Sequence, residues 1–226
     1  MRPYTKTVLP AELLTWQGSG HTWNDFARDE ASCQPIKAVL QAEQHHLCCY
    51  CETRFGIADS HIEHSQPRNG PYGVPTLTFD YGNLGCSCNG GTERNRHCGH
   101  HKGQEYDLSR FVNASADDSG RLFAYTVDGG IGGMPRLSPT DQARVHYMIR
   151  TLNLDCPRLT NMRRSHAAGL QTAIQGMIDA GAIDDIDDLA LSYLTPGNDG
   201  KLQRFFSVSR QMFGDRADAV LGLLEE

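Results

Sequence analysis

The sequence predicts an α+β protein that is mostly α-helical, with a small metal-ordered segment between an N-terminal and a C-terminal helical segment. Two observations support this fold class. Apolar residues recur at helical spacing before residue 47 and after residue 138. The stretch between them is rich in Gly, Cys, His and Asn and has no helical periodicity. We therefore expect three segments, 1–47, 48–136 and 137–226.

The composition is typical of a soluble globular protein. The chain has 226 residues, of which 39% are hydrophobic and 21% charged, and this suits one domain or a small domain within a larger one. No apolar run approaches the roughly 18 residues of a membrane helix, and the first residues do not resemble a secretory signal. We expect a cytoplasmic protein without a membrane partner. The net charge of −6 disfavours tight binding of nucleic acid by this chain alone.

The sequence of the N-terminal segment predicts two helices. Pro10 can begin a short one, because proline is favoured in the first turn. The second helix is indicated by Ile36, Val39, Leu40 and Leu47, which lie on roughly one helical face.

The C-terminal segment predicts longer helices. Ser138 is expected as an N-cap, with Pro139 in the first helical position. Another helix should follow Pro157 and end at Gly181. Its expected buried side consists of apolar residues at helical spacing, namely Leu159, Met162, Leu170, Ile174 and Ile178. A last amphipathic stretch begins at Leu202. We expect 137–226 to dock on a protein partner.

Charge is unevenly distributed in this segment. An arginine-rich stretch spans 136–164 and predicts a basic helical face, which is a possible contact for nucleic acid. Its arginines are Arg136, Arg144, Arg150, Arg158, Arg163 and Arg164. Five aspartates between 179 and 188 predict an acidic loop. The two stretches are either surfaces for two partners or two solvated faces.

The cysteines of the middle segment predict a structural zinc site. Cys48 and Cys51 have the C-x-x-C spacing that lets two thiolates bind one Zn²⁺, and a tetrahedral site needs two more. We favour Cys88 and Cys98 as the other two ligands, with Cys86 as the alternative to Cys88. A redox role for the C-x-x-C pair is disfavoured, because no helix clearly follows it.

The residues between and after these cysteines suit phosphodiester hydrolysis. Glu63 and His64 place a carboxylate beside an imidazole on a strand-like stretch, and more histidines accompany Cys98. A carboxylate and an imidazole can hold a divalent cation that stabilises the leaving oxygen. An imidazole that is not bound to metal can take a proton from the attacking water. Lys102 is positioned to hold a neighbouring phosphate.

In this order, the motifs resemble those of the HNH endonucleases, which have a ββα-metal core. They are the C-x-x-C pair, "IEH" before a proline, "NL", and the closing "HCGHHKG". The flanks "KTVLPAELL" and "IRTLNLDCPRL" resemble a narrower group, the PtuB-type nuclease subunits of Septu and retron anti-phage defence systems. The resemblance implies a zinc-stapled ββα-metal core inserted between the two helical segments.

The resemblance also implies residue roles. His64 would be the general base, and Asn83 would orient it. Glu63 would bind the catalytic cation, Mg²⁺ or a similar ion. His61 shares the strand face of Glu63 and is expected as a neighbour of the site.

The last ligand implied by the resemblance is a histidine on the helix after Cys98. We favour His100, with His101 and His97 as alternatives; the last two have the i, i+4 spacing of one helical face. The position after Cys98, often Asn in the wider family, is Gly99 here.

The implied partners are a DNA or RNA substrate, tRNA included, and an ABC/SMC-like ATPase subunit. In retrons, the reverse transcriptase and its DNA join them. The competing function is a non-catalytic zinc-knuckle module that binds nucleic acid or a protein. That function leaves Glu63, His64 and Asn83 without a role. A redox switch built on Cys48, Cys49 and Cys51 is a third possibility.

Overall fold

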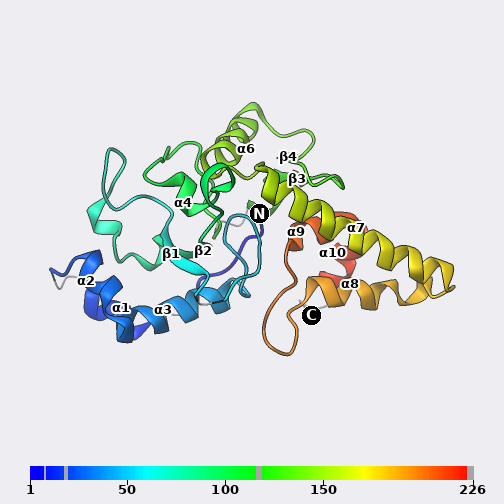
Figure 1. The fold of residues 1–226 in the computed structure, drawn as a ribbon, viewed down its shortest axis with the longest axis horizontal. Coiled ribbons are helices and arrows are strands. Elements are labelled where there is room, and N and C mark those ends of the chain that lie inside the picture. The colour runs from blue at the N-terminus through cyan, green and yellow to red at the C-terminus, as the bar shows by residue number, and fades with distance from the viewer. Residues whose placement is uncertain (8, 18–19, 57, 116–118, 223–226) are drawn as a thin grey trace.

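The computed structural model describes residues 1–226 except 8, 18–19, 57, 116–118 and 223–226. Figure 1 shows the N-terminal helices at one end, a two-stranded sheet near the middle, and a group of C-terminal helices projecting at the other end. The described residues are mostly helical, with two small two-stranded sheets, which confirms the α+β, mostly helical prediction. Among them, no helix is both long and apolar enough to cross a membrane.

The N-terminal segment forms three helices, α1 (Ala11–Trp16), α2 (Trp23–Arg28) and α3 (Glu30–Glu43). α1 follows Pro10 as predicted. α2 was not predicted; it begins with a capping box in which Thr22 and Asp25 each accept the other's backbone N–H. In α3, Ile36 and Leu40 are fully buried, as the periodicity predicted.

The middle segment contains the elements β1 (Ser60–His64), β2 (Leu84–Cys88) and α4 (Gly99–Lys102), in that order. The two strands are antiparallel, with Ser60 opposite Cys88 and His64 opposite Leu84. The loop between them, 65–83, contains two short 3₁₀ turns, Pro75–Leu77 and Tyr81–Asn83, and a third, Glu93–Asn95, precedes α4.

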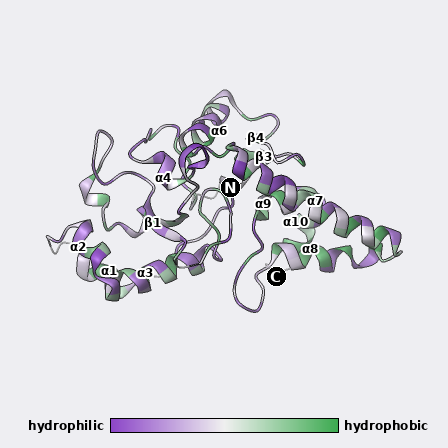
Figure 2. Ribbon diagram, viewed as in Figure 1, coloured by the Kyte–Doolittle hydropathy of each residue, from purple (hydrophilic) through white to green (hydrophobic). Residues whose placement is uncertain are grey.

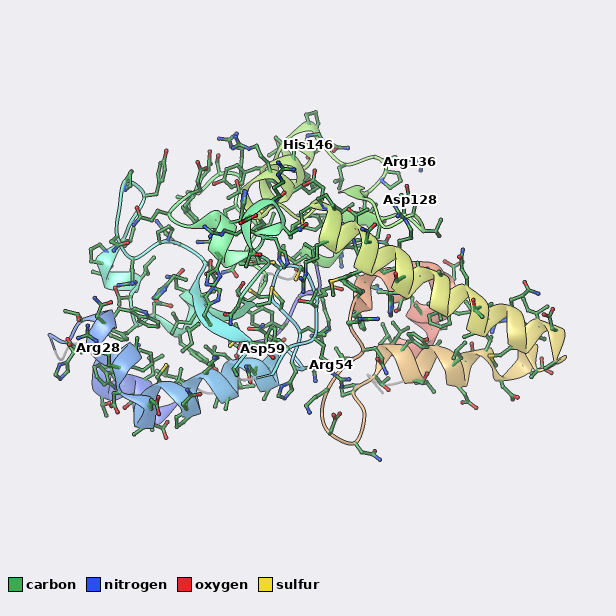
Figure 3. The ribbon with its side chains drawn as sticks, viewed as in Figure 1. Arg28, Arg54, Asp59, Asp128, Arg136 and His146 are labelled. Carbon is green, nitrogen blue, oxygen red and sulfur yellow. The ribbon has the colours of Figure 1, made fainter. Side chains whose placement is uncertain are left out.

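A second hairpin follows, which the sequence analysis did not predict. It consists of the antiparallel strands β3 (Phe123–Tyr125) and β4 (Ile131–Gly133), and the short helix α5 (Ser119–Leu122) precedes it. Its turn contains Gly129 at φ +89°, where an added Cβ would lie 2.0 Å from the carbonyl oxygen of Thr160 in α7. Glycine is therefore required for this turn to pack against α7. Figure 3 labels Asp128, next to Gly129, beside the first turns of that helix.

The C-terminal segment contains five helices: α6 (Pro139–Leu152), α7 (Pro157–Asp179), α8 (Ile186–Leu194), α9 (Phe206–Phe213) and α10 (Asp215–Gly222). Ser138 caps α6 by accepting the backbone N–H of Asp141, as predicted. Ile178 was wrongly predicted to be buried, since its side chain is 49% exposed. The acidic stretch is not simply a loop, because a 3₁₀ turn (Ile183–Asp185) and the start of α8 form within it.

Three hydrophobic clusters organise the described residues. The largest includes residues from Met1 to Leu159 and crosses both expected segment boundaries. The second lies among α7, α8, α9 and α10 and also includes Leu47. A small third cluster consists of Ala167, Phe205 and Val208. In Figure 2, α8 is coloured more uniformly hydrophobic than α7, consistent with its place in the second cluster. The division into three segments stays a prediction.

Glu52 links the C-x-x-C turn to the C-terminal helices. It directly follows Cys51 and is 3% exposed. Its carboxylate accepts hydrogen bonds from the backbone N–H (2.8 Å) and the hydroxyl (2.6 Å) of Ser207, which lies in α9. It also pairs with the α-amino group of Met1 at 3.3 Å. A buried carboxylate with these partners holds the two parts of the molecule together.

One arginine of the predicted basic face, Arg163, is buried, so the prediction is wrong for this residue. Arg163 is 1% exposed and donates to the carbonyl oxygens of Gly129 (2.8 Å) and Leu154 (2.9 Å). It anchors the β3–β4 turn to α7 and is not accessible to nucleic acid. Arg164, its neighbour, is exposed and donates to the carbonyl oxygen of Asp128.

His166 in α7 makes the stability of the C-terminal helices depend on pH. It is buried, and one ring nitrogen lies 2.8 Å from the hydroxyl of Ser209 in α9. Burial and the charge of Arg204 lower its pKa to about 4, against an opposing effect of Glu52. As the pH falls below about 6.5, the unfolded chain takes up a proton that the folded chain does not, and stability falls until about pH 4.

We predict that wild type loses about 2 kcal/mol more unfolding free energy between pH 7.5 and pH 5 than the variant His166→Gln, which keeps a polar partner for Ser209. Urea unfolding at both pH values measures the difference. Titration of other histidines cancels because both proteins contain them. An equal loss in both proteins would contradict the assignment.

Candidate functional site

Four thiols of the middle segment meet in one buried cluster. The sulfur atoms of Cys48, Cys51, Cys88 and Cys98 all lie within 4.8 Å of one another. Two of the separations are 3.8 Å (Cys48 to Cys98) and 3.7 Å (Cys51 to Cys88). Tetrahedral zinc with Zn–S bonds of about 2.3 Å places its sulfur ligands about 3.8 Å apart. The donor set therefore fits a structural Zn²⁺ ion.

Backbone contacts position this cluster. The N–H of Cys49 donates to the carbonyl oxygen of Cys86 at 3.1 Å, which docks the C-x-x-C turn on β2. The N–H of Cys88 donates to the sulfur of Cys48 at 3.3 Å. The hairpin register places Cys88 at the end of β2, opposite Ser60. Local chain geometry therefore brings the thiols together from both ends of the segment.

Cys86, the alternative to Cys88, lies outside the cluster. Its thiol donates to the carbonyl oxygen of Lys37 in α3 at 3.6 Å, and burial raises its pKa to about 12. The side-chain amide of Gln44 pairs with the backbone N–H (2.7 Å) and carbonyl (2.8 Å) of Cys86. The structure thus brings Cys88 and not Cys86 to the other thiols, while their role as zinc ligands stays a prediction.

Two thiols of the cluster are shifted toward the thiolate, the form of cysteine that binds metal. Burial raises the pKa of Cys48, but hydrogen bonds from neighbouring thiols, that of Cys49 first, outweigh it and hold the pKa well below its ordinary value. The bond with Cys48 raises the pKa of Cys88, but the bonds with Cys51 and Cys98 outweigh it and lower the pKa to about 6. Burial raises the pKa of the other two thiols, Cys51 and Cys98, well above the ordinary value.

Glu63 lies buried beside an ammonium group, an imidazole and a phenol hydroxyl. Its Oε1 lies 3.0 Å from Nζ of Lys102 and 3.2 Å from the hydroxyl of Tyr50. Its Oε2 lies 3.2 Å from Nε2 of His61. Burial raises the pKa of this carboxyl, but the bond to His61 and the charge of Lys102 more than compensate and lower it. Glu63 is therefore a carboxylate, the form that binds a cation.

Lys102 does not have the role expected from the sequence. It is 3% exposed, and its ammonium also donates to the carbonyl oxygen of His64 at 3.0 Å. A side chain enclosed in this way cannot hold a substrate phosphate. It connects α4 to the end of β1 and keeps Glu63 ionised.

His64 is a buried neutral imidazole. Nε2 lies 2.9 Å from the carbonyl oxygen of Thr78, and the ring packs edge-on against Trp23 at 4.3 Å between centroids. Burial lowers the pKa of His64 to about 4, although the Thr78 contact and the charge of Glu63 oppose the shift. Since a carbonyl only accepts, Nε2 carries the proton and the other ring nitrogen is left as a proton acceptor. This is the state that a general base requires.

Asn83 holds the loop between the strands. Its amide oxygen accepts the backbone N–H of Gln66 at 2.8 Å, and its amide nitrogen donates to the carbonyl oxygens of Gln66 (3.0 Å) and Leu77 (3.1 Å). These bonds engage both ends of the amide group with the loop backbone rather than with His64. Leu77 precedes Thr78, whose carbonyl contacts His64. Asn83 thus fixes the segment that contacts His64, while its role in orienting that base stays a prediction.

Two of the three candidate histidines near residue 100 lie away from Glu63. His97 is buried beside the cysteine cluster, with Nδ1 3.2 Å from the sulfur of Cys98. His101 places Nδ1 2.9 Å from the carbonyl oxygen of Thr151 in α6. The predicted shared helical face of His97 and His101 is wrong, because α4 begins only at Gly99.

His100 is the candidate that lies near Glu63. Its ring stacks on that of His61, with centroids 4.3 Å apart and an interplanar angle of 3°. His61 in turn contacts Glu63. Its pKa is raised, because the bond and charge of Glu63 outweigh the effect of burial. The structure thus assembles His61, Glu63 and His100. The sequence analysis favoured His61 as a neighbour of the site over His61 as a member of it.

The sequence analysis missed the residues that surround these side chains. Trp23 and Thr78 enclose His64, and Tyr50 contacts Glu63. The guanidinium of Arg68 lies 5.7 Å from the ring centroid of Trp23. Only Arg68 gave a signal, as a basic residue soon after His64; the other contacts cross long stretches of sequence.

A cleft of about 460 Å³ adjoins the loop after His64. Its lining includes Gln66, Tyr72, Arg110, Tyr147 and Arg150. Both Arg110 and Arg150 lie over the ring of Tyr147, at 5.0 and 5.9 Å. Aromatic rings and guanidinium groups in this combination can stack with bases and pair with phosphates.

The chain is similar to a bacterial retron protein. No protein-family model matches it. It is 25% identical over 171 residues to "Retron Vc95 putative HNH endonuclease" from Vibrio cholerae serotype O1 biovar El Tor. The alignment covers 73% of this chain and 81% of the relative. This similarity supports the resemblance to HNH endonucleases noted in the sequence.

We predict that Cys88→Ser loses structural metal. Zinc measured by mass spectrometry should fall from about one ion per chain to near zero, and the unfolding temperature should fall by about 10 °C. Cys86→Ser is the matched control, because it removes a buried thiol two residues away and leaves the cluster intact. Zinc loss in the Cys86 variant with retention in the Cys88 variant would refute the proposed ligand set.

Proposed function

We propose that the protein is a metal-dependent HNH endonuclease that hydrolyses phosphodiester bonds. The observation that carries this proposal is that His64, a neutral imidazole, directly follows Glu63, an ionised carboxylate, at the end of β1 and beside α4. The order β1, β2, α4 and the cysteine cluster support a zinc-stapled ββα-metal core. The similarity to a named HNH endonuclease supports the same function.

Each side chain then has a role in hydrolysis. Glu63 and His100 hold a divalent cation, which when bound supplies positive charge to the leaving oxygen. His64 takes the proton of the attacking water at the ring nitrogen that does not face Thr78. Asn83 keeps Thr78 in place, and Lys102 maintains the charge of Glu63.

Nucleic acid reaches this site along the cleft beside it. Tyr72 is 54% exposed and can stack with a base, while Arg150 can contact phosphates. Arg110 is paired with Asp107, which also lines the cleft. Arg68, beside Trp23, is closest to His64 among these arginines in chain position and can hold the phosphate next to the scissile bond. These groups recognise features common to DNA and RNA.

We also propose that the protein acts in the cytoplasm as the effector of a prokaryotic anti-phage system of the Septu or retron kind. Its partner would be an ABC/SMC-like ATPase, with reverse transcriptase and its DNA in a retron. The similarity to a retron protein supports this setting. The net charge of −6 is consistent with a nuclease that obtains much of its affinity for nucleic acid from a partner.

We predict that His64→Ala loses cleavage by at least about a hundredfold, because no other group replaces the general base. Cleavage of plasmid DNA and of tRNA, with and without the ATPase, provides the measurement. Zinc content and circular dichroism should match wild type.

The control is His146→Ala, which removes an exposed imidazole on α6 (Figure 3). It should cleave at the wild-type rate. Undiminished cleavage by His64→Ala would rule out the assigned base, and a wild-type protein inactive on both substrates in every combination would rule out the nuclease function.

We place the ATPase contact at the far end of α7. This end of α7 projects away from the N-terminal helices (Figure 1). Ile178 and Ile183 are 49% and 42% exposed and have Asp179, Asp184 and Asp185 as sequence neighbours. We predict that replacing both with Asp reduces co-purification of the ATPase at least about tenfold, because exposed apolar anchors are desolvated in interfaces. Leu14→Asp in α1, at the opposite end of the molecule, should have no effect. Unchanged co-purification of the double variant would exclude this contact.

A further inference from the structure

Gly99 leaves a small space between β1 and the start of α4. A Cβ atom added there would lie 2.3 Å from Oε2 of Glu63 and 2.7 Å from Nε2 of His61. Both separations are far shorter than a non-bonded contact, so a side chain at this position would displace these two groups. The absence of a side chain at Gly99 therefore lets the carboxylate oxygen and the imidazole nitrogen lie together against the start of α4.

Oε2 is the oxygen of Glu63 that faces this space. The other oxygen, Oε1, is already engaged by Lys102 and Tyr50. Carboxylates that bind metal are commonly held by such outer hydrogen bonds, which fix their orientation. The distance between Oε2 and Nε2 of His61, 3.2 Å, also suits two donors to one cation.

Asn89 orients both stacked imidazoles. Its side-chain oxygen lies 3.3 Å from Nδ1 of His61, and its carbonyl oxygen lies 2.6 Å from Nδ1 of His100. When a cation takes the place of the proton between His61 and Glu63, these oxygen acceptors hold the remaining proton of each ring on Nδ1 and leave each Nε2 with an electron pair for the cation. Because the rings are parallel and both Nδ1 atoms face Asn89, both Nε2 atoms face away from it. For His61, that direction is toward Glu63.

Asn89 is itself fixed by the hairpin. Its backbone N–H donates to the carbonyl oxygen of Asp59 at 3.0 Å, and its amide nitrogen donates to that of Ala58 at 3.3 Å. Asn89 is thus held on one side by the residues before β1 and directs two histidines on the other. Partners that fix ligand orientation in this way are a general feature of metal sites.

We propose that His61 is the third protein ligand of the cation site, with Glu63 and His100, and that Asn89 is its positioning residue. The proposal rests on the proposed function of this site as a metal-dependent nuclease. Two imidazoles and one carboxylate favour a transition-metal ion such as Mn²⁺ over Mg²⁺, which prefers oxygen ligands. The sequence predicted Mg²⁺ or a similar divalent ion. The proposed ligands favour, among such ions, one that binds nitrogen donors.

The test measures Mn²⁺ binding to the zinc-loaded full chain. The electron paramagnetic resonance signal of the free ion reports how much Mn²⁺ is unbound. Wild type should bind one Mn²⁺ ion at least about tenfold more tightly than Mg²⁺, measured by competition. His61→Gln keeps a hydrogen-bond donor for Glu63 without an imidazole, and it should weaken Mn²⁺ binding at least about tenfold. Gly99→Ala, which fills the space, should abolish binding.

Asn89→Ala leaves its backbone carbonyl for His100 but removes the partner of His61, so it should weaken Mn²⁺ binding roughly tenfold. His101→Ala is the matched control on α4 and should bind as wild type does. Wild-type Mn²⁺ affinity in both His61→Gln and His61→Ala would overturn the proposal, as would tighter binding of Mg²⁺ than of Mn²⁺.

His64→Ala separates this proposal from the nuclease function. If it binds Mn²⁺ normally but does not cleave, both stand. If wild type binds Mn²⁺ through His61 but cleaves no substrate, the cation site stands and the nuclease function fails. If His61→Gln cleaves and binds Mn²⁺ as wild type does, the nuclease function stands and the proposed ligand fails.

Discussion

The four-thiol cluster is the constraint on which the rest of the structure depends. The segment between Cys48 and Cys98 has two short strands and long irregular loops, and such a segment rarely holds its shape through hydrophobic contacts alone. The cluster joins its two ends. The N–H of Cys98 also donates to the carbonyl oxygen of Leu152 at the end of α6. The cluster therefore fixes three parts of the chain together: the turn at 48–51, the end of β2 and the start of α4.

Lys102 connects the cysteine cluster to Glu63 and His64. It lies four residues after Cys98, on the one-turn helix that the cluster fixes, and its ammonium contacts both Glu63 and the backbone of His64. A buried ammonium is costly unless it is paired and hydrogen-bonded, and here it has both kinds of partner. Moving α4 would leave this ammonium unpaired and remove one of the partners of Glu63, so the arrangement resists displacement. The cluster thus helps to set the position of Glu63 without touching it.

The sequence predicted what depends on local pattern and missed what depends on distant contacts. Most helices followed from periodicity and caps, as in α6 after Ser138. Spacing narrowed the third thiol of the cluster to two positions, but only the docking of β2 separates Cys88 from Cys86. The wall around His64 comes from Trp23, about forty residues earlier on a helix that periodicity did not reveal. Its position is set by tertiary packing and leaves no local signal.

Glu63 and His64 are neighbours in the chain but occupy opposite environments. Successive side chains of a strand point to opposite faces, so Glu63 faces Lys102 and His61 while His64 faces an aromatic ring and a carbonyl. The first environment favours a charge and the second disfavours one, and the pKa values of Glu63 and His64 are both lowered for these different reasons. A carboxylate that stays ionised and an imidazole that stays neutral are the two forms that the proposed cation binding and proton acceptance require. The alternation of a single strand therefore gives adjacent residues the two environments that the proposed function needs.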